Sequence, residues 1–281
     1  MRSLAAVFLI PALFLAACGD DDDGGGDGDL LSMAIEALEG ADSYYVESLT
    51  VDADGSELTD RLWVDGDRYR VVSSGTSNEP DVVVGTGEFV VDGEDAFYRE
   101  CADVDRDCDD WERLDSDIPV GFLAVSPETL TSLLSVLAEQ ARETTNAGTE
   151  TIDGRELERI EARYNPARAN AAFFDALPDL FSEPGEFCYT VGDAQATPTE
   201  VCEEFTPEPT TPVPEEIFEE WEDRLMPLTV WVDPESGLPY RIETESPADP
   251  FSDDSADHET GTSTLVFSDF GEVVVEAPEV E

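Results

Sequence analysis

The sequence predicts an α+β fold in which one large antiparallel sheet carries a few helices. A β-branched residue followed by Asp-Gly recurs at Val64-Asp65-Gly66, Val91-Asp92-Gly93 and Ile152-Asp153-Gly154, and this pattern between apolar stretches is a strong hairpin signal. About ten strand-like stretches surround these turns, close to the size at which a twisted open sheet curls. Two helical patterns interrupt the strands without alternating with them, which favours α+β over α/β.

Three helices are expected along the chain. Leu30–Ala41 has apolar residues at helical spacing, and Gly40 should end that helix. Ser126–Arg142 begins with Ser126 as N-cap and a proline in the first turn. Asn165–Leu177 begins with Asn-Pro and stops before the next proline.

Strands are expected where β-branched and aromatic residues cluster between turn signals. These stretches are Tyr44–Asp52, Leu58–Val64, Arg68–Ser73, Asp81–Thr86, Glu88–Val91, Ala96–Arg99, Glu156–Tyr164, Leu228–Val232, Tyr240–Thr244, Thr262–Phe267 and Val273–Glu276. Residues 182–216 lack this pattern and are rich in Pro, Thr and Glu, so we expect a surface insertion within one domain that spans residues 30–281.

The N-terminal stretch predicts a lipid anchor. Leu15-Ala16-Ala17-Cys18 ends an apolar run that follows Arg2, as in a secretory signal peptide. The stretch also resembles the lipobox of bacterial lipoproteins, which implies a signal peptide over residues 1–17 and an acylated Cys18 as the lipid-attachment site. An ordinary signal peptide or an uncleaved helix is the alternative, although the run is short for a membrane span of ~20 residues.

Residues 18–29 form a spacer, because only Gly and Asp follow Cys18 there and such a segment cannot bury anything. The rest of the chain is therefore expected to be extracytoplasmic and tethered to the cell membrane by the lipid on Cys18.

The formal net charge is −54, with 68 acidic residues against 14 Arg and no Lys. Such a charge excludes nucleic acid as a partner, because that binding depends on cationic neutralisation of phosphates. It also repels anionic lipid head groups, so a covalent anchor would be needed to hold the protein at a membrane. A salt-loving host would produce the same acidity, so the charge does not by itself define the function.

Four cysteines remain once Cys18 is set aside: Cys101, Cys108, Cys188 and Cys202. An even number in an exported chain predicts disulfides, and closeness in sequence favours Cys101–Cys108 and Cys188–Cys202 among three pairings. Metal binding is the alternative, but no His or third Cys accompanies either pair, so no metal site is expected.

Signals for other chemistry are weak. Asp103–Asp110 alternates acids as a calcium loop does, but Cys108 and Leu114 stand where an EF-hand has Gly and Glu, which favours a disulfide-closed hairpin loop. The single His258 lies in an acidic loop, and the chain has no G-x-S-x-G or H-E-x-x-H motif. We therefore expect neither catalysis nor a cofactor.

Three stretches carry a family resemblance: ALEGADSYYVES (Ala37–Ser48), LTVWVDPESGLPYRIETES (Leu228–Ser246) and TSTLVFSDFGEVVVEAP (Thr262–Pro278). They resemble the opening helix and strand and the closing strands of the LppX/LprG-type lipoproteins, which belong to the LolA-like superfamily. The resemblance implies a curved antiparallel half-barrel, with helices packed on its concave face and an apolar cavity that accepts acyl chains. The acidity and the cysteine-bearing insertion depart from that family.

Candidate ligand-binding residues come from the resemblance. A leucine stripe on Ser126–Arg142 is by itself an ordinary core-facing helix face, and only the half-barrel makes it a cavity wall. The candidates are Leu130, Leu133, Leu134, Leu137, Val230 and Ile242. We expect a lipoprotein that binds or carries a lipid's acyl chains. The alternative is a sensor or interaction lipoprotein with a filled core and an envelope protein as partner, and the volume of the cavity distinguishes the two.

Overall fold

The fold is that of a computed structural model, which describes residues 27–76, 86–93, 95–103, 106–114, 126–176, 185–191, 199–205, 215–247 and 259–280. Its helices are α1 (Asp27–Glu39), α3 (Pro127–Gln140), α4 (Pro166–Ala176) and α5 (Glu215–Glu220). Its strands are β1 (Ser43–Val51), β2 (Glu57–Asp65), β3 (Arg68–Thr76), β4 (Thr86–Asp92), β5 (Asp95–Asp103), β6 (Arg106–Cys108), β7 (Glu112–Leu114), β8 (Ala141–Ile152), β9 (Arg155–Tyr164), β10 (Gly185–Val191), β11 (Thr199–Phe205), β12 (Met226–Val232), β13 (Pro239–Pro247) and β14 (Thr260–Ser268).

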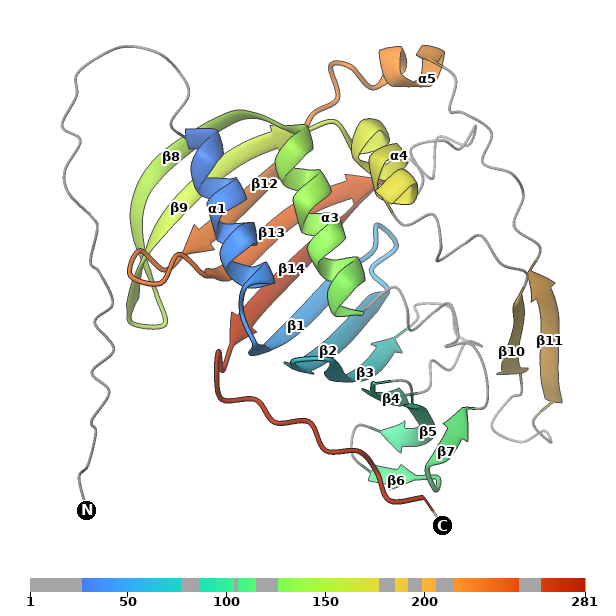
Figure 1. The fold of residues 1–281 in the computed structure, drawn as a ribbon. Helices are drawn as coiled ribbons and strands as arrows, with labels where there is room; N and C mark the ends of the chain where they lie inside the picture. Colours follow the sequence, from blue (N-terminus) through green and yellow to red (C-terminus); the bar gives the residue numbers. More distant parts are fainter. Residues whose placement is uncertain are drawn as a thin grey trace, which may run out of the picture.

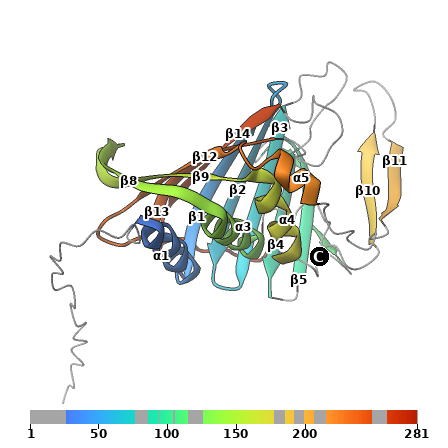
Figure 2. The same cartoon turned by 90° about the horizontal axis from the view of Figure 1, so that it is seen from above.

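Twelve of these strands form one antiparallel sheet in the order β6-β5-β4-β3-β2-β1-β14-β13-β12-β9-β8, with β7 paired to β5. The sheet curves, and α1, α3 and α4 lie together on its concave face (Figures 1 and 2). This confirms the predicted fold class, a curved antiparallel half-barrel with helices on the concave face. Strands β10 and β11 pair in a separate two-stranded sheet.

The core lies between the helices and the concave face. Because side chains alternate across a strand, every second residue of the central strands points to the helices. Val46, Leu62, Val71 and Phe267 occupy one register row across β1, β2, β3 and β14, and each is at most 3% exposed. Helix α1 covers the β12–β13 side of this face with Leu31, Ala34, Ile35 and Leu38.

The helix ends follow the capping residues in the sequence. Helix α1 stops at Glu39 as predicted, and the Gly40 N–H closes its last turn by donating to the Glu36 carbonyl at 3.1 Å. The Ser126 Oγ accepts from the Thr129 N–H at 3.1 Å and caps α3. Helix α1 begins at Asp27, three residues inside the predicted spacer, while residues 1–26 lie outside the described part of the chain.

Helix α3 ends earlier than predicted, because the chain turns into strand β8 at Ala141. The sequence did not predict β8. Its residues are mostly exposed and polar, so no apolar alternation marks it, and its ladder with β9 forms at the end of the sheet. Within the predicted insertion, β10 and β11 likewise form strands that the sequence analysis missed, and α5 begins at its end.

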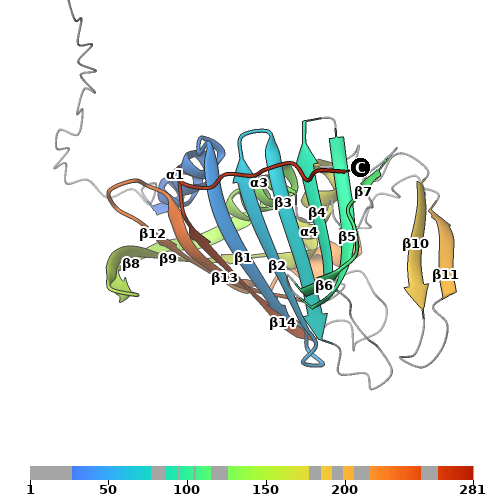
Figure 3. The ribbon, with the colours of Figure 1, turned by 90° about the horizontal axis from the view of Figure 1, so that it is seen from below.

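The strand predicted at Val273–Glu276 is wrong, because this segment has no strand ladder. The C-terminal segment instead crosses the outer face of the sheet over β1 to β5 (Figure 3). Val275 is buried there against Val90 and Phe97. Side chains replace the missing ladder, since Arg68 Nη1 donates to the Val275 carbonyl and the Val275 N–H donates to Asp65 Oδ2, both at 3.2 Å.

Two further expectations lie partly or wholly outside the described residues. Only Thr86 of the strand predicted at Asp81–Thr86 is described, and it begins β4. The acidic loop with His258 is not described. In the part of the chain that is described, no helix has the length and apolar character needed to cross a membrane.

Candidate functional site

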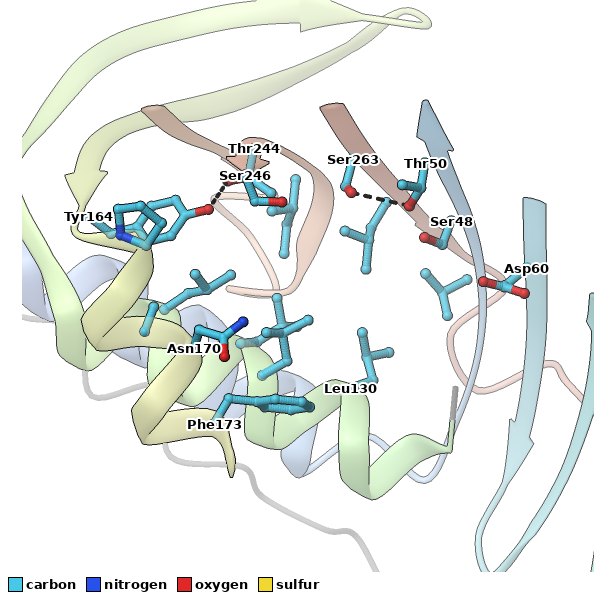
Figure 4. Close-up of a pocket in the computed structure, with 18 of the residues that line it drawn as sticks. Ser48, Thr50, Asp60, Leu130, Tyr164, Asn170, Phe173, Thr244, Ser246 and Ser263 are labelled. Carbon is cyan, nitrogen blue, oxygen red and sulfur yellow. Dashed lines mark hydrogen bonds between the residues drawn. The ribbon is translucent and has the colours of Figure 1, made fainter. Parts of the chain in front are cut away.

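A cavity of about 390 Å³ lies between helices α3 and α4 and the concave face of the sheet. Strands β1, β2, β13 and β14 supply one wall, and the two helices supply the opposite one (Figure 4). Its volume falls within the ~300–1,000 Å³ that is typical of pockets for small molecules.

The helix wall is mainly apolar. Helix α3 contributes the leucine stripe of Leu130, Leu133, Leu134 and Leu137, and α4 adds Ala169 and Phe173. Helical spacing places all four leucines on one face of α3, which is why a capped helix with this stripe lines the cavity along its length.

Asn165 fixes the position of α4 and therefore of this wall. Its Oδ1 accepts from the Arg168 N–H at 3.0 Å and caps the helix. Its Nδ2 donates to the carbonyl of Trp221 at 2.9 Å, directly after α5. Asn165 and Trp221 are both 1% exposed, so α4 is held by a fully buried hydrogen bond.

The sheet wall changes from apolar to hydroxyl-bearing along each strand. The residues that line the cavity run through Val46, Ser48 and Thr50 in β1, through Ile242, Thr244 and Ser246 in β13, and through Leu265 and Ser263 in β14. Because β14 is antiparallel to both neighbours, the hydroxyl groups of all three strands meet at the same end of the cavity. The cavity is therefore amphipathic.

Hydrogen bonds connect the groups at this polar end. The Thr50 and Ser263 hydroxyls are 3.1 Å apart (Figure 4). The Tyr164 hydroxyl donates to the Glu245 carbonyl at 2.6 Å and accepts from the Thr244 hydroxyl at 3.3 Å. Burial raises the pKa of the Tyr164 phenol, so it is neutral and acts here as a hydrogen-bonding hydroxyl.

Asp60 is the one charged side chain among the described residues that line the cavity. It lies on β2 opposite Ser48 of β1 and Ser73 of β3, and the Ser73 hydroxyl donates to its Oδ1. Burial raises the pKa of the Asp60 carboxyl, although the hydrogen bond from Ser73 opposes this shift.

Five of the six residues predicted to bind ligand surround this cavity: the four leucines of α3 and Ile242. Val230 does not, because it lies one strand further along the sheet, under α1, beside a separate void of about 10 Å³. Helix α1 fills that half of the barrel, which restricts the cavity to the side under α3 and α4. The ligand-binding role of all six residues stays a prediction.

Sequence reasoning missed the polar half of the site. A signal was present, because the inward positions of β1 and β13 both change from apolar to hydroxyl residues while keeping the strand period. Asp60, Tyr164 and Asn170 had no such signal. Only the pairing of strands and the packing of α4 bring them to the cavity.

Cys101 and Cys108 do not line the cavity. The predicted Cys101–Cys108 disulfide is confirmed, and it joins β5 to β6. Cys188 and Cys202 stand directly opposite each other in the β10–β11 ladder, so the second pairing suits the backbone and stays a prediction.

A carboxylate oxygen of Glu88 and the Sγ atoms of Cys101 and Cys108 lie within 4.8 Å of one another, which is close enough for a shared metal ion. The sulfurs are bonded to each other, so they offer no thiolate to a metal ion. The calcium loop weighed at Asp103–Asp110 includes residues outside the described part and stays untested.

No protein-family model and no curated protein matches the sequence. Among solved structures, the chain is similar to the lipoprotein LppX of Mycobacterium tuberculosis, with 16% identity, a TM-score of 0.44, and coverage of 89% of this chain and 99% of that one. It is also similar to LprF of Mycobacterium bovis, with 12% identity, a TM-score of 0.45, and coverage of 89% and 94%. An outer membrane lipoprotein-sorting protein domain of Vibrio parahaemolyticus matches at 12% identity and a TM-score of 0.23, with 88% and 94% covered. At these scores the fold assignment rests on the sheet order of this chain and not on the matched structures.

Proposed function

We propose that this protein is a membrane-anchored extracytoplasmic lipoprotein that binds or carries a hydrophobic ligand in the half-barrel cavity. The observation that carries the proposal is the cavity of about 390 Å³ with an apolar helix wall and a polar end. A chain of methylene groups is stabilised there by ~0.8 kcal/mol for each CH₂ removed from water, so acyl chains bind without specific polar contacts.

The cavity volume favours a carrier over an interaction protein with a filled core. Protein interiors are packed to crystal-like density with few voids larger than a water molecule. A volume of this size therefore exceeds ordinary packing defects, and it lies at the lower end of the range for ligand pockets. We infer that it takes one acyl chain rather than several.

The proposed ligand site is tested by filling it. Leu133 is half-buried and lines the cavity, so Leu133→Trp should project an indole into the space for the acyl chain. Its neighbour Ser132 faces the outer groove formed with α1 and α4, which makes Ser132→Trp the matched control. The protein is the mature chain from residue 18 with Cys18→Ser, exported behind an ordinary secretory leader so that it carries no acyl anchor.

Native mass spectrometry after detergent-free purification, together with uptake of a fluorescent monoacylglycerol, measures occupancy. We expect lipid binding in the wild type and in Ser132→Trp, and its loss in Leu133→Trp with the folded circular dichroism spectrum retained. A folded wild type that carries no lipid and takes up no probe would contradict the proposal.

The anchor is a separate part of the proposal, supported by the lipobox-like ending at Cys18. The test uses the precursor with its own N-terminal leader. There, Cys18→Ala should abolish incorporation of a fatty-acid analogue, because the Cys18 thiol is the acceptor. Labelling that persists in this variant would refute the anchor.

A further inference from the structure

The polar end of the cavity holds one carboxylate among its hydroxyl groups, and an ionised carboxylate only accepts hydrogen bonds. Among the described residues, Ser73 donates to Oδ1 of Asp60, and Oδ2 receives no hydrogen bond. An ionised carboxylate accepts at about four lone-pair positions, so most of its capacity is unused. Figure 4 shows this carboxylate beside Ser48, at the polar end of the cavity.

Asn170 adds an amide to the helix wall of the cavity. Its side chain lines the cavity from α4, and its Oδ1 is buried with no hydrogen-bond partner in the part of the chain that is described. A buried acceptor without a partner is unfavourable, because it has lost its hydrogen bonds to water. Figure 4 shows the amide nitrogen toward the cavity and the oxygen away from it, and a half-turn about the broad terminal torsion of the amide would exchange the two. The Asp60 carboxylate would be satisfied by a ligand that donates hydrogen bonds, and the Asn170 amide by a ligand that donates or accepts them.

The charge of the cavity points the same way. No Arg lines it among the described residues, and the chain has no Lys, so no cation there offsets the Asp60 carboxylate. The raised pKa of Asp60 is consistent with this, because burial without a neighbouring cation disfavours the charged form. A phosphate or carboxylate head group would bring a second negative charge beside Asp60 and would donate no hydrogen bond once fully ionised.

We infer that the polar part of the ligand is an uncharged group that donates hydrogen bonds, such as the hydroxyls of an acylglycerol, and that Asp60 selects it against anionic head groups. This inference rests on the proposed function and specifies which amphiphiles the cavity takes. Asp60 is then a specificity-determining residue, while the leucines of α3 contact the acyl chain whatever the head group.

Two amphiphiles that differ by one phosphate test the inference. Monolaurin and lauroyl lysophosphatidate share the acyl chain and the glycerol, and each competes with a fluorescent monoacylglycerol for the delipidated mature chain with Cys18→Ser. We expect the wild type to bind monolaurin at least about tenfold more tightly than lauroyl lysophosphatidate. Asp60→Asn keeps an acceptor for Ser73 and removes the charge, so this preference should fall toward unity through tighter binding of the phosphate.

Asp67→Asn is the matched control, because Asp67 is exposed on the turn between β2 and β3 and its loss changes the net charge by the same amount. The preference should persist in this variant, and thermal melting should show that both variants remain folded. Equal binding of the two amphiphiles by the wild type, or the same loss of preference in both variants, would overturn the role of Asp60 and leave the proposed function intact. Binding of neither amphiphile, nor of the probe, would overturn the proposed function itself.

Discussion

Replacing Glu88 with glutamine should destabilise the fold far more than the same change at an exposed glutamate. Glu88 of β4 is 2% exposed and is ion-paired to Arg70 of β3 and to Arg99 of β5, whose Nε lies 2.6 Å from Glu88 Oε2. Each guanidinium also stacks on a tryptophan, Arg70 at 4.8 Å from the centroid of Trp63 and Arg99 at 4.4 Å from that of Trp111. The carboxylate thus links three neighbouring strands on the outer face of the sheet.

The magnitude follows from the burial of the three charges. Removing one partner of a fully buried ion pair costs about 3–5 kcal/mol, because the remaining charge is left uncompensated. The side chains of Arg70 and Arg99 are 31% and 23% exposed, so water screens part of that loss, but both lose the same partner and then repel each other. We expect Glu88→Gln to lower the free energy of unfolding by about 2–4 kcal/mol.

Urea unfolding followed by tryptophan fluorescence measures the change, with the slope of the transition checked for constancy. Glu47→Gln is the control, because Glu47 pairs with Arg61 at 2.9 Å, is 44% exposed in its side chain, and also lies on the sheet. Exposed pairs of this kind contribute at most about 1 kcal/mol. Each variant removes one negative charge from a chain of net charge −54, so the change in overall charge repulsion is the same in both and cancels in the comparison. Equal destabilisation in the two variants would refute the argument from burial.

Two further predictions concern stability. Replacing Cys101 and Cys108 by serine should lower the free energy of unfolding by ~2–3 kcal/mol, because the disulfide closes a short loop, and addition of a reductant should then have no further effect at this site. Asp60 should destabilise the fold as pH rises, because its folded pKa lies above the ordinary value of 3.8 and ionisation therefore costs the folded state more. Asp60→Asn should raise the free energy of unfolding at about pH 7 and make little difference near pH 3, and a gain that does not vary with pH would contradict this reasoning.

Local features were predictable from the sequence because a few neighbouring residues determine them. The Asp153-Gly154 turn adopts positive φ at both positions, 50° and 82°, as a two-residue hairpin turn requires. The cap at Ser126 depends on one hydrogen bond from the Thr129 N–H to the Ser126 hydroxyl oxygen, and the last turn at Gly40 depends on one backbone hydrogen bond. These interactions form in the same way whatever surrounds them, so α1, α3 and the central hairpins followed from the sequence.

Features that depend on distant partners did not follow from it. The sequence of Val273–Glu276 alternates like a strand, but Asp65 and Arg68 bind its backbone in place of a ladder, and they lie about two hundred residues earlier in the chain. Strand β8 is polar and is held by its ladder with β9, so composition alone did not identify it. Local patterns record which face of a segment is buried, and they do not record what buries it.

The cavity also combines a part that the local sequence predicted with a part that depends on distant partners. The leucine stripe of α3 was visible in the sequence, because helical periodicity alone brings those side chains to one face. The polar end exists because the pairing of β1 with β2 and β14 aligns Ser48 with Asp60 and Thr50 with Ser263. A shift of one residue in either pairing would turn these groups to the opposite face of the sheet. The sequence by itself determined that an apolar helix would cover a sheet, and only the tertiary register decided that a single carboxylate and a row of hydroxyls would face it.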